Sequence, residues 1–170
     1  MAGKGSKMRK YIIVTLLSML FAGAGPAYGG EIAIIVNKAN AIEDISFREL
    51  GMILKMEKKF WDDGSEIYLV TRGSRSPEKE AVLKTVYKMD EQELKKFWLV
   101  KIYQGTVPSF PKVIASNESV KAFVRQVPNA VGYIDAAYAD DSVKVLKVDG
   151  KLPGENEYKL AGDKNDEDQI

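Results

Sequence analysis

Apolar segments of strand length alternate with amphipathic segments of helix length along the chain, and this alternation limits the possible folds more than any other feature. The predicted strands are EIAIIV (31–36), IYLVTR (67–72), VIA (113–115), AVGYID (130–135) and VKVLKV (143–148). One helix is predicted after the first strand, two after the second and one after the third. Because strands that alternate with helices build a sheet covered on both faces, we expect an α/β fold with a mixed, mostly parallel sheet.

The four predicted helices share a start signal, a side-chain oxygen that can cap the first turn. The capping residues are Ser46, Ser76, Asp90 and Ser116. Pro77 suits the first helical position after Ser76, because its missing N–H would have no helical partner there. Gly132, inside a strand pattern, predicts that another element approaches the backbone closely.

The first 29 residues have the pattern of a secretory signal peptide, which ends at the small residues of Ala27-Tyr28-Gly29. Four basic residues precede an apolar run of about 15 residues, which is shorter than the roughly 20 that a membrane span needs. The alternative is an uncleaved N-terminal anchor. We expect a signal peptide over 1–29, one domain over 30–160 and a disordered acidic tail over 161–170, in a periplasmic protein.

Charge and composition exclude several classes of function. Without residues 1–29, which hold four of the 25 basic residues and no acid, the chain has 21 basic and 24 acidic residues and a net charge of −3. Nucleic-acid binding is not expected from such a chain. The absence of histidine and cysteine removes Ser-His-Asp and Cys-His catalysis and imidazole metal sites. We expect no enzyme activity, no metal and no cofactor.

The segment TRGSRSPEKE (71–80) is the strongest candidate site. A predicted strand ends at Arg72, a helix begins after Ser76, and ligands of open α/β sheets bind at the carboxyl ends of strands. A guanidinium forms two hydrogen bonds with an oxyanion, and Ser74, Arg75 and Ser76 add hydroxyls and charge. The alternative is an ordinary capped helix in which Arg72 pairs with a nearby carboxylate. Glu78 and Glu80 in the first turn oppose a bound anion.

Asn37 and Lys38 follow the first predicted strand. Because they leave this strand at its carboxyl end, we expect them near the same rim. The ligand-binding residues predicted from the sequence are therefore Arg72, Ser74, Arg75, Ser76, Asn37 and Lys38. A polar loop without a ligand is the alternative for the last two.

Four segments in this order resemble the phosphate-binding proteins of ABC transporters, which are type II periplasmic binding proteins. The segments are VNKANAIEDISFREL, VTRGSRSPEKEAVL, ELKKFW followed by YQGTVP, and VRQVPNAVGYID. The similarity is greatest to short, single-domain relatives, and it implies a fold like one of the two lobes of the full-length proteins. In it, Arg72 matches the arginine that binds phosphate, and Ser76 matches the serine of a Ser-Gly-Thr segment. Pro77 and Glu78 stand where that segment has glycine and threonine.

The resemblance implies a periplasmic solute-binding module for phosphate or a similar oxyanion. Its partners would be an ABC transporter permease or a second protein chain. The alternative function is that of a ligand-free structural or interaction protein that uses a degenerate binding lobe. Pro77 and Glu78 favour this alternative, whereas Arg72 and Ser76 favour binding.

Overall fold

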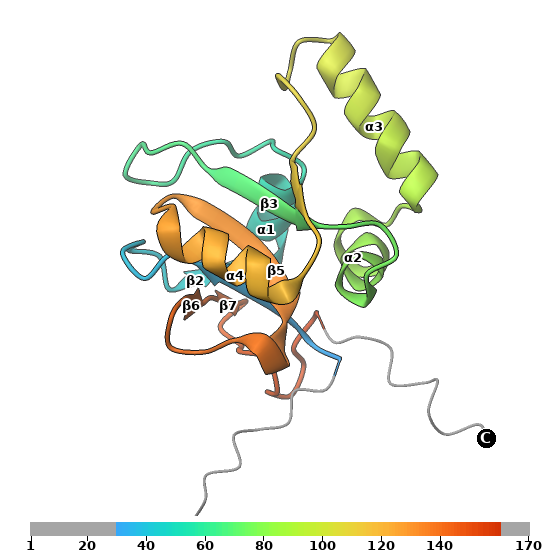
Figure 1. Ribbon diagram of the computed structural model, residues 1–170. Helices are drawn as coiled ribbons and strands as arrows, with labels where there is room; N and C mark the ends of the chain where they lie inside the picture. Colours follow the sequence, from blue (N-terminus) through green and yellow to red (C-terminus); the bar gives the residue numbers. More distant parts are fainter. Residues whose placement is uncertain (1–29, 161–170) are drawn as a thin grey trace, which may run out of the picture.

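The structure is a computed structural model that describes residues 30–160, so the predicted signal peptide and acidic tail lie outside the described residues. Strands and helices alternate along this range as the sequence predicts (Figure 1). In chain order they are β1 (Ile32–Val36), β2 (Asp44–Ile45), α1 (Phe47–Leu54), β3 (Tyr68–Arg72), α2 (Pro77–Val82), η1 (Leu83–Tyr87), α3 (Glu91–Tyr103), β4 (Lys112–Ile114), α4 (Asn117–Gln126), β5 (Ala130–Asp135), η2 (Ala136–Tyr138), β6 (Lys144–Val145) and β7 (Lys147–Val148).

A five-stranded sheet in the order β4-β3-β5-β1-β6 forms the centre of the domain. β3 is parallel to both β4 and β5, whereas β1 is antiparallel to both β5 and β6. A second, two-stranded sheet pairs β2 with β7 in parallel. Three of these five pairings are parallel, so the predicted mixed, mostly parallel arrangement is confirmed.

Helices cover both faces of the large sheet, as predicted. On one face, Val120 and Val124 of α4 pack against Val70 of β3 and Ile134 of β5. On the other face, a larger apolar cluster joins the sheet to α1, α2, η1 and α3. Figure 1 shows α4 lying across the sheet and α3 projecting away from it. Within residues 30–160, no helix is long and apolar enough to cross a membrane.

The predicted helix starts are confirmed. At each one, a side-chain oxygen accepts a hydrogen bond from the backbone N–H three residues later; the capping residues are Ser46, Ser76, Asp90 and Ser116. Pro77 occupies the first position of α2, and Asp90 and Glu93 form a complete capping box. These signals depend only on neighbours in the chain, which explains why they could be predicted from the sequence.

The carboxyl-terminal strand predicted over 143–148 is wrong in extent. It consists of β6 and β7, which belong to different sheets and are separated by the fully buried Leu146. The N–H of Leu146 donates to the carbonyl oxygen of Ile34 (2.9 Å), so the chain leaves the large sheet at this residue. The partner of β7 is β2, a two-residue strand that the sequence analysis missed because its pairing depends on contacts about a hundred residues apart.

Replacing Gly132 by alanine is expected to lower the free energy of unfolding by about 1–3 kcal/mol, the usual cost of overpacking. A Cβ atom at Gly132 would lie 2.9 Å from Cγ1 of Val120, which confirms the predicted close approach. Urea unfolding of Gly132→Ala measures the effect. Gly73→Ala is the matched control, because a Cβ atom there meets nothing within 4 Å. Equal stability of the two variants would contradict this packing.

Candidate functional site

The carboxyl ends of the three parallel strands β3, β4 and β5 meet at one edge of the sheet, where α2 and α4 begin. Arg72 ends β3 beside Ile114 of β4, and its side chain is buried, with 6% of the residue exposed. Its backbone N–H donates to the hydroxyl of Tyr133 on β5 (3.3 Å). Contacts with both neighbouring strands, β4 and β5, therefore fix the position of Arg72.

The guanidinium of Arg72 is bound to Glu78 in the first turn of α2. Nε and Nη2 of Arg72 donate to the same oxygen, Oε2 of Glu78, at 3.3 and 3.2 Å. Nη1 donates to the carbonyl oxygen of Ile114 (3.4 Å). The sequence analysis left open whether Arg72 binds an anion or pairs with a nearby carboxylate, and in this structure it pairs with a carboxylate close to the Ser76 turn.

Glu78 is itself surrounded by donors. Its second oxygen accepts a hydrogen bond from Nδ2 of Asn117 (2.7 Å), the first residue of α4, and only 5% of Glu78 is exposed. Burial acts to raise the pKa of Glu78. The hydrogen bond from Asn117, its own backbone N–H and the charge of Arg72 outweigh burial, so the pKa lies below its ordinary value. The corner thus holds an ionised carboxylate at neutral pH.

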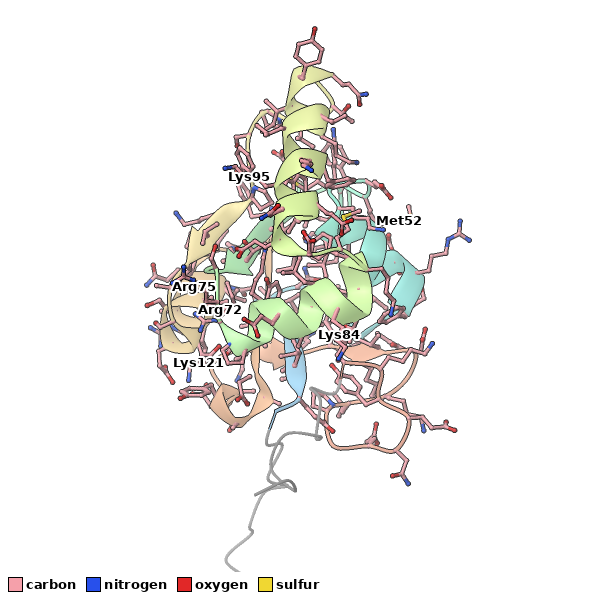
Figure 2. All side chains as sticks on the ribbon, turned by 90° about the vertical axis from the view of Figure 1, so that its right-hand side faces the viewer. Met52, Arg72, Arg75, Lys84, Lys95 and Lys121 are labelled. Carbon is pink, nitrogen blue, oxygen red and sulfur yellow. The ribbon has the colours of Figure 1, made fainter. Side chains whose placement is uncertain are left out.

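The other predicted residues of this segment differ in their roles around the Arg72–Glu78 pair. The hydroxyl oxygen of Ser76 accepts from the N–H of Lys79 (3.2 Å), so Ser76 serves as the helix cap. Ser74 and Arg75 are exposed, and Arg75 has a left-handed backbone conformation (φ 65°). Figure 2 shows Arg72 and Arg75 at the amino end of α2, with Lys95 higher up on α3. We call Arg72, Ser74, Arg75, Ser76, Glu78 and Asn117 the Arg72 corner.

Asn37 and Lys38 do not join this corner, which corrects the sequence-based expectation. β1 is antiparallel to β5, which is parallel to β3, so the carboxyl end of β1 lies at the opposite edge of the sheet. Nδ2 of Asn37 donates to the carbonyl oxygens of Val124 and Arg125 (3.0 and 2.7 Å) at the carboxyl end of α4. Asn37 therefore caps a helix end, and Lys38 is exposed beside it.

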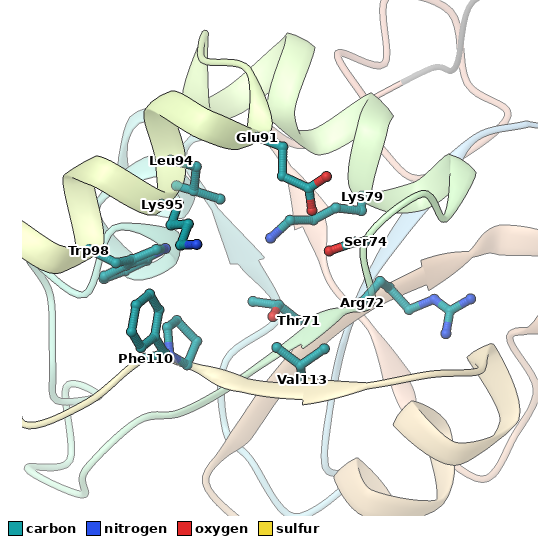
Figure 3. Close-up of a pocket in the computed structure, with 11 residues that line it drawn as sticks. Thr71, Arg72, Ser74, Lys79, Glu91, Leu94, Lys95, Trp98, Phe110 and Val113 are labelled. Carbon is teal, nitrogen blue, oxygen red and sulfur yellow. The ribbon is translucent and has the colours of Figure 1, made fainter.

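A cavity of about 330 Å³ lies between α3 and the edge formed by β3 and β4 (Figure 3). We call it the Lys79 cavity. Its lining consists of Thr71, Arg72, Ser74, Lys79, Glu91, Leu94, Lys95, Trp98, Phe110, Pro111 and Val113. Trp98 belongs to the apolar core and also lines this cavity. That role depends on how the loop before β4 folds back on α3, which no local pattern indicates.

At the carboxyl edge of the sheet, the guanidinium of Arg72 thus binds one oxygen of Glu78 and the amide of Asn117 binds the other. Ligands of open α/β sheets bind at this edge.

Solved structures of phosphate-binding proteins resemble this chain, which confirms the resemblance predicted from the sequence. One is a phosphate ABC transporter substrate-binding protein from Clostridium perfringens with bound phosphate, with a TM-score of 0.59 and 28% sequence identity. The match covers 72% of the present chain and 46% of the Clostridium chain. A second is an ABC-type phosphate transport receptor from Vibrio cholerae, with a TM-score of 0.59 and 24% identity; the match covers 72% of the present chain and 48% of the receptor. A third is PstS from Borrelia burgdorferi, with a TM-score of 0.63 and 20% identity; the match covers 78% of the present chain and 55% of PstS. The chain thus spans about half the length of these relatives. No protein-family model and no curated protein matches it.

Proposed function

We propose that the protein is a periplasmic, non-enzymatic solute-binding module for phosphate or a similar oxyanion, which acts with an ABC transporter. The observation that carries the proposal is the set of donors around Glu78. Arg72 and Asn117 already surround a carboxylate with charged and neutral hydrogen-bond donors, at 2.7–3.3 Å. Groups that hold a carboxylate oxygen in this way are suited to an oxygen of phosphate.

The occupied corner also determines how the ligand would bind. Glu78 must leave the guanidinium of Arg72 before an external anion can contact it, and this displacement costs free energy. Ser74 and Arg75 are exposed at the entrance and are available to the incoming anion. Affinity should be weak without a second chain, because the anion must displace Glu78 from Arg72 and a single lobe leaves part of the ligand in contact with water.

Phosphate is expected to raise the melting temperature of the purified protein only at high, roughly millimolar concentrations, because stabilisation grows with the logarithm of one plus the ratio of its concentration to its Kd. Arg75→Gln, which removes a charge at the entrance, should weaken the effect by a few fold. Lys38→Gln removes the same charge at the opposite edge of the sheet and is the matched control. A thermal-shift titration with phosphate, repeated with chloride at equal ionic strength, measures both.

The outcome against the proposal is equally clear. If phosphate gives no more stabilisation than chloride, or if Lys38→Gln weakens it as much as Arg75→Gln, the Arg72 corner is not a phosphate site. The alternative from the sequence analysis, an interaction protein without a ligand, would then take its place.

A further inference from the structure

The Lys79 cavity has the features of a binding site for a second kind of ligand. Arg72 and Ser74 of the Arg72 corner also line it, but the guanidinium of Arg72 points away from the cavity (Figure 3), toward Glu78. Its volume of about 330 Å³ lies within the range of small-molecule sites. The cavity combines apolar walls with a buried cation, and these two features together define what it can bind.

Lys79 supplies the buried cation. Only 8% of the residue is exposed, and Figure 3 shows its ammonium group directed into the cavity. Within residues 30–160 the ammonium forms no hydrogen bond or ion pair with another residue, and it lies 5.8 Å from the centroid of the Tyr87 ring. The described residues contain no fully buried side-chain nitrogen or oxygen without a hydrogen-bond partner, so solvent in the cavity reaches this ammonium. An anion in the cavity would replace that solvent with a charge-assisted hydrogen bond that the protein itself does not provide.

The other charges around Lys79 leave the cavity positive. Lys95 also directs its ammonium into the cavity, whereas Glu91 is the acidic residue of the lining. Two lysines against one glutamate give an excess of one positive charge. Burial lowers the pKa of Lys79, and the charge of Glu91 opposes this shift only in part. The balance favours a ligand with a single negative charge.

The walls of the cavity are apolar and aromatic. Trp98 and Leu94 belong to α3, Val113 belongs to β4, and Phe110 lies in the loop before β4. Phe110 is 46% exposed, so it lies at the mouth, whereas Trp98 is buried. Flat rings stack favourably on such side chains, and their burial adds the hydrophobic contribution.

We propose that the Lys79 cavity binds a small aromatic organic anion, with its ring between Trp98 and Phe110 and its acid group against Lys79. This site goes beyond the proposed phosphate function and does not depend on it, because the guanidinium of Arg72 is directed away from the cavity and Glu78 does not line it.

An NMR titration of the purified protein with naphthoate, naphthamide and acetate tests the site. Naphthamide has the ring without the charge, and acetate has the acid group without the ring. Naphthoate should shift the indole N–H signal of Trp98 saturably, with a Kd at least about tenfold lower than that of either analogue, since a charged hydrogen bond contributes about 1.5 kcal/mol or more. Trp61, the other of the two tryptophans, does not line the cavity and serves as the internal reference.

Three variants separate charge, ring and background effects. Lys79→Met should weaken the binding of naphthoate about tenfold and leave the affinity for naphthamide unchanged. Phe110→Ala, at an exposed position that should not disturb folding, should weaken both. Lys96→Gln, which removes a charge from the exposed side of α3, should change neither. Equal binding of naphthoate by wild type and Lys79→Met, equal affinities for naphthoate and naphthamide, or no saturable shift at Trp98 would each overturn the proposal.

Discussion

Replacing Glu78 by threonine is expected to tighten phosphate binding by about 10- to 100-fold. The substitution removes the carboxylate that occupies Arg72 and Asn117, so the incoming anion no longer has to displace it. Hydrogen bonds to charged groups contribute about 1.5–3 kcal/mol, and 1.4 kcal/mol corresponds to a factor of ten in Kd. Calorimetric titration of wild type and Glu78→Thr with phosphate measures the difference.

The stability of the same variant provides an independent readout. Without phosphate, Glu78→Thr leaves the buried guanidinium of Arg72 without its ionic partner and should be less stable than wild type. Added phosphate should restore the lost stability. Glu80→Thr is the matched control, because Glu80 lies in the same turn of α2 but is exposed. If Glu80→Thr improves phosphate binding as much as Glu78→Thr, a general charge effect explains the result and the role of Glu78 is contradicted.

Replacing Arg72 by alanine is expected to lower the free energy of unfolding by about 3–5 kcal/mol, since it leaves a buried carboxylate without its cation. The double variant Arg72→Met/Glu78→Gln should recover a large part of the lost stability. Glutamine has no charge and still offers an acceptor to Nδ2 of Asn117. Urea unfolding of the wild type and both variants measures the effect. A loss below about 1 kcal/mol in Arg72→Ala would mean that the pair is hydrated rather than buried.

The acid dependence of stability should come partly from the same pair. The pKa of Glu78 is lower in the folded than in the unfolded protein, despite the opposing effect of burial. Its stabilising contribution is therefore complete above the unfolded pKa of about 4.3 and declines as the pH falls through the folded value. Glu78→Gln has no proton to gain there, so its stability should fall less steeply than that of wild type below about pH 4.5. Parallel pH profiles would contradict the shift.

The features of this fold that could be predicted from the sequence are those set by neighbouring residues. Ser76 and Asp90 begin helices because their side chains cap N–H groups three residues away. The strands that become β1, β3 and β5 are long apolar runs that a buried sheet requires.

The features that could not be predicted depend on pairing between distant segments. The direction of β1 relative to β5 placed Asn37 and Lys38 at the opposite edge from Arg72, and no local pattern indicates a strand's direction. The two-residue strands β2 and β7 exist only because they pair with each other. Both candidates for the corner, an anion site or an ion pair, were visible in Arg72 and Glu78. Choosing between them required the position of Asn117 on α4, which is 39 residues from Glu78.

The measurement that tests the central claim most directly is an NMR titration of the Glu78→Thr protein with phosphate, observing the Nε–H signal of the Arg72 side chain. Our account predicts that this signal shifts saturably, with the same Kd as calorimetry gives. If phosphate binds while the Arg72 signal stays unchanged, or if no binding is detected at all, the corner does not hold an external oxyanion and the account is wrong.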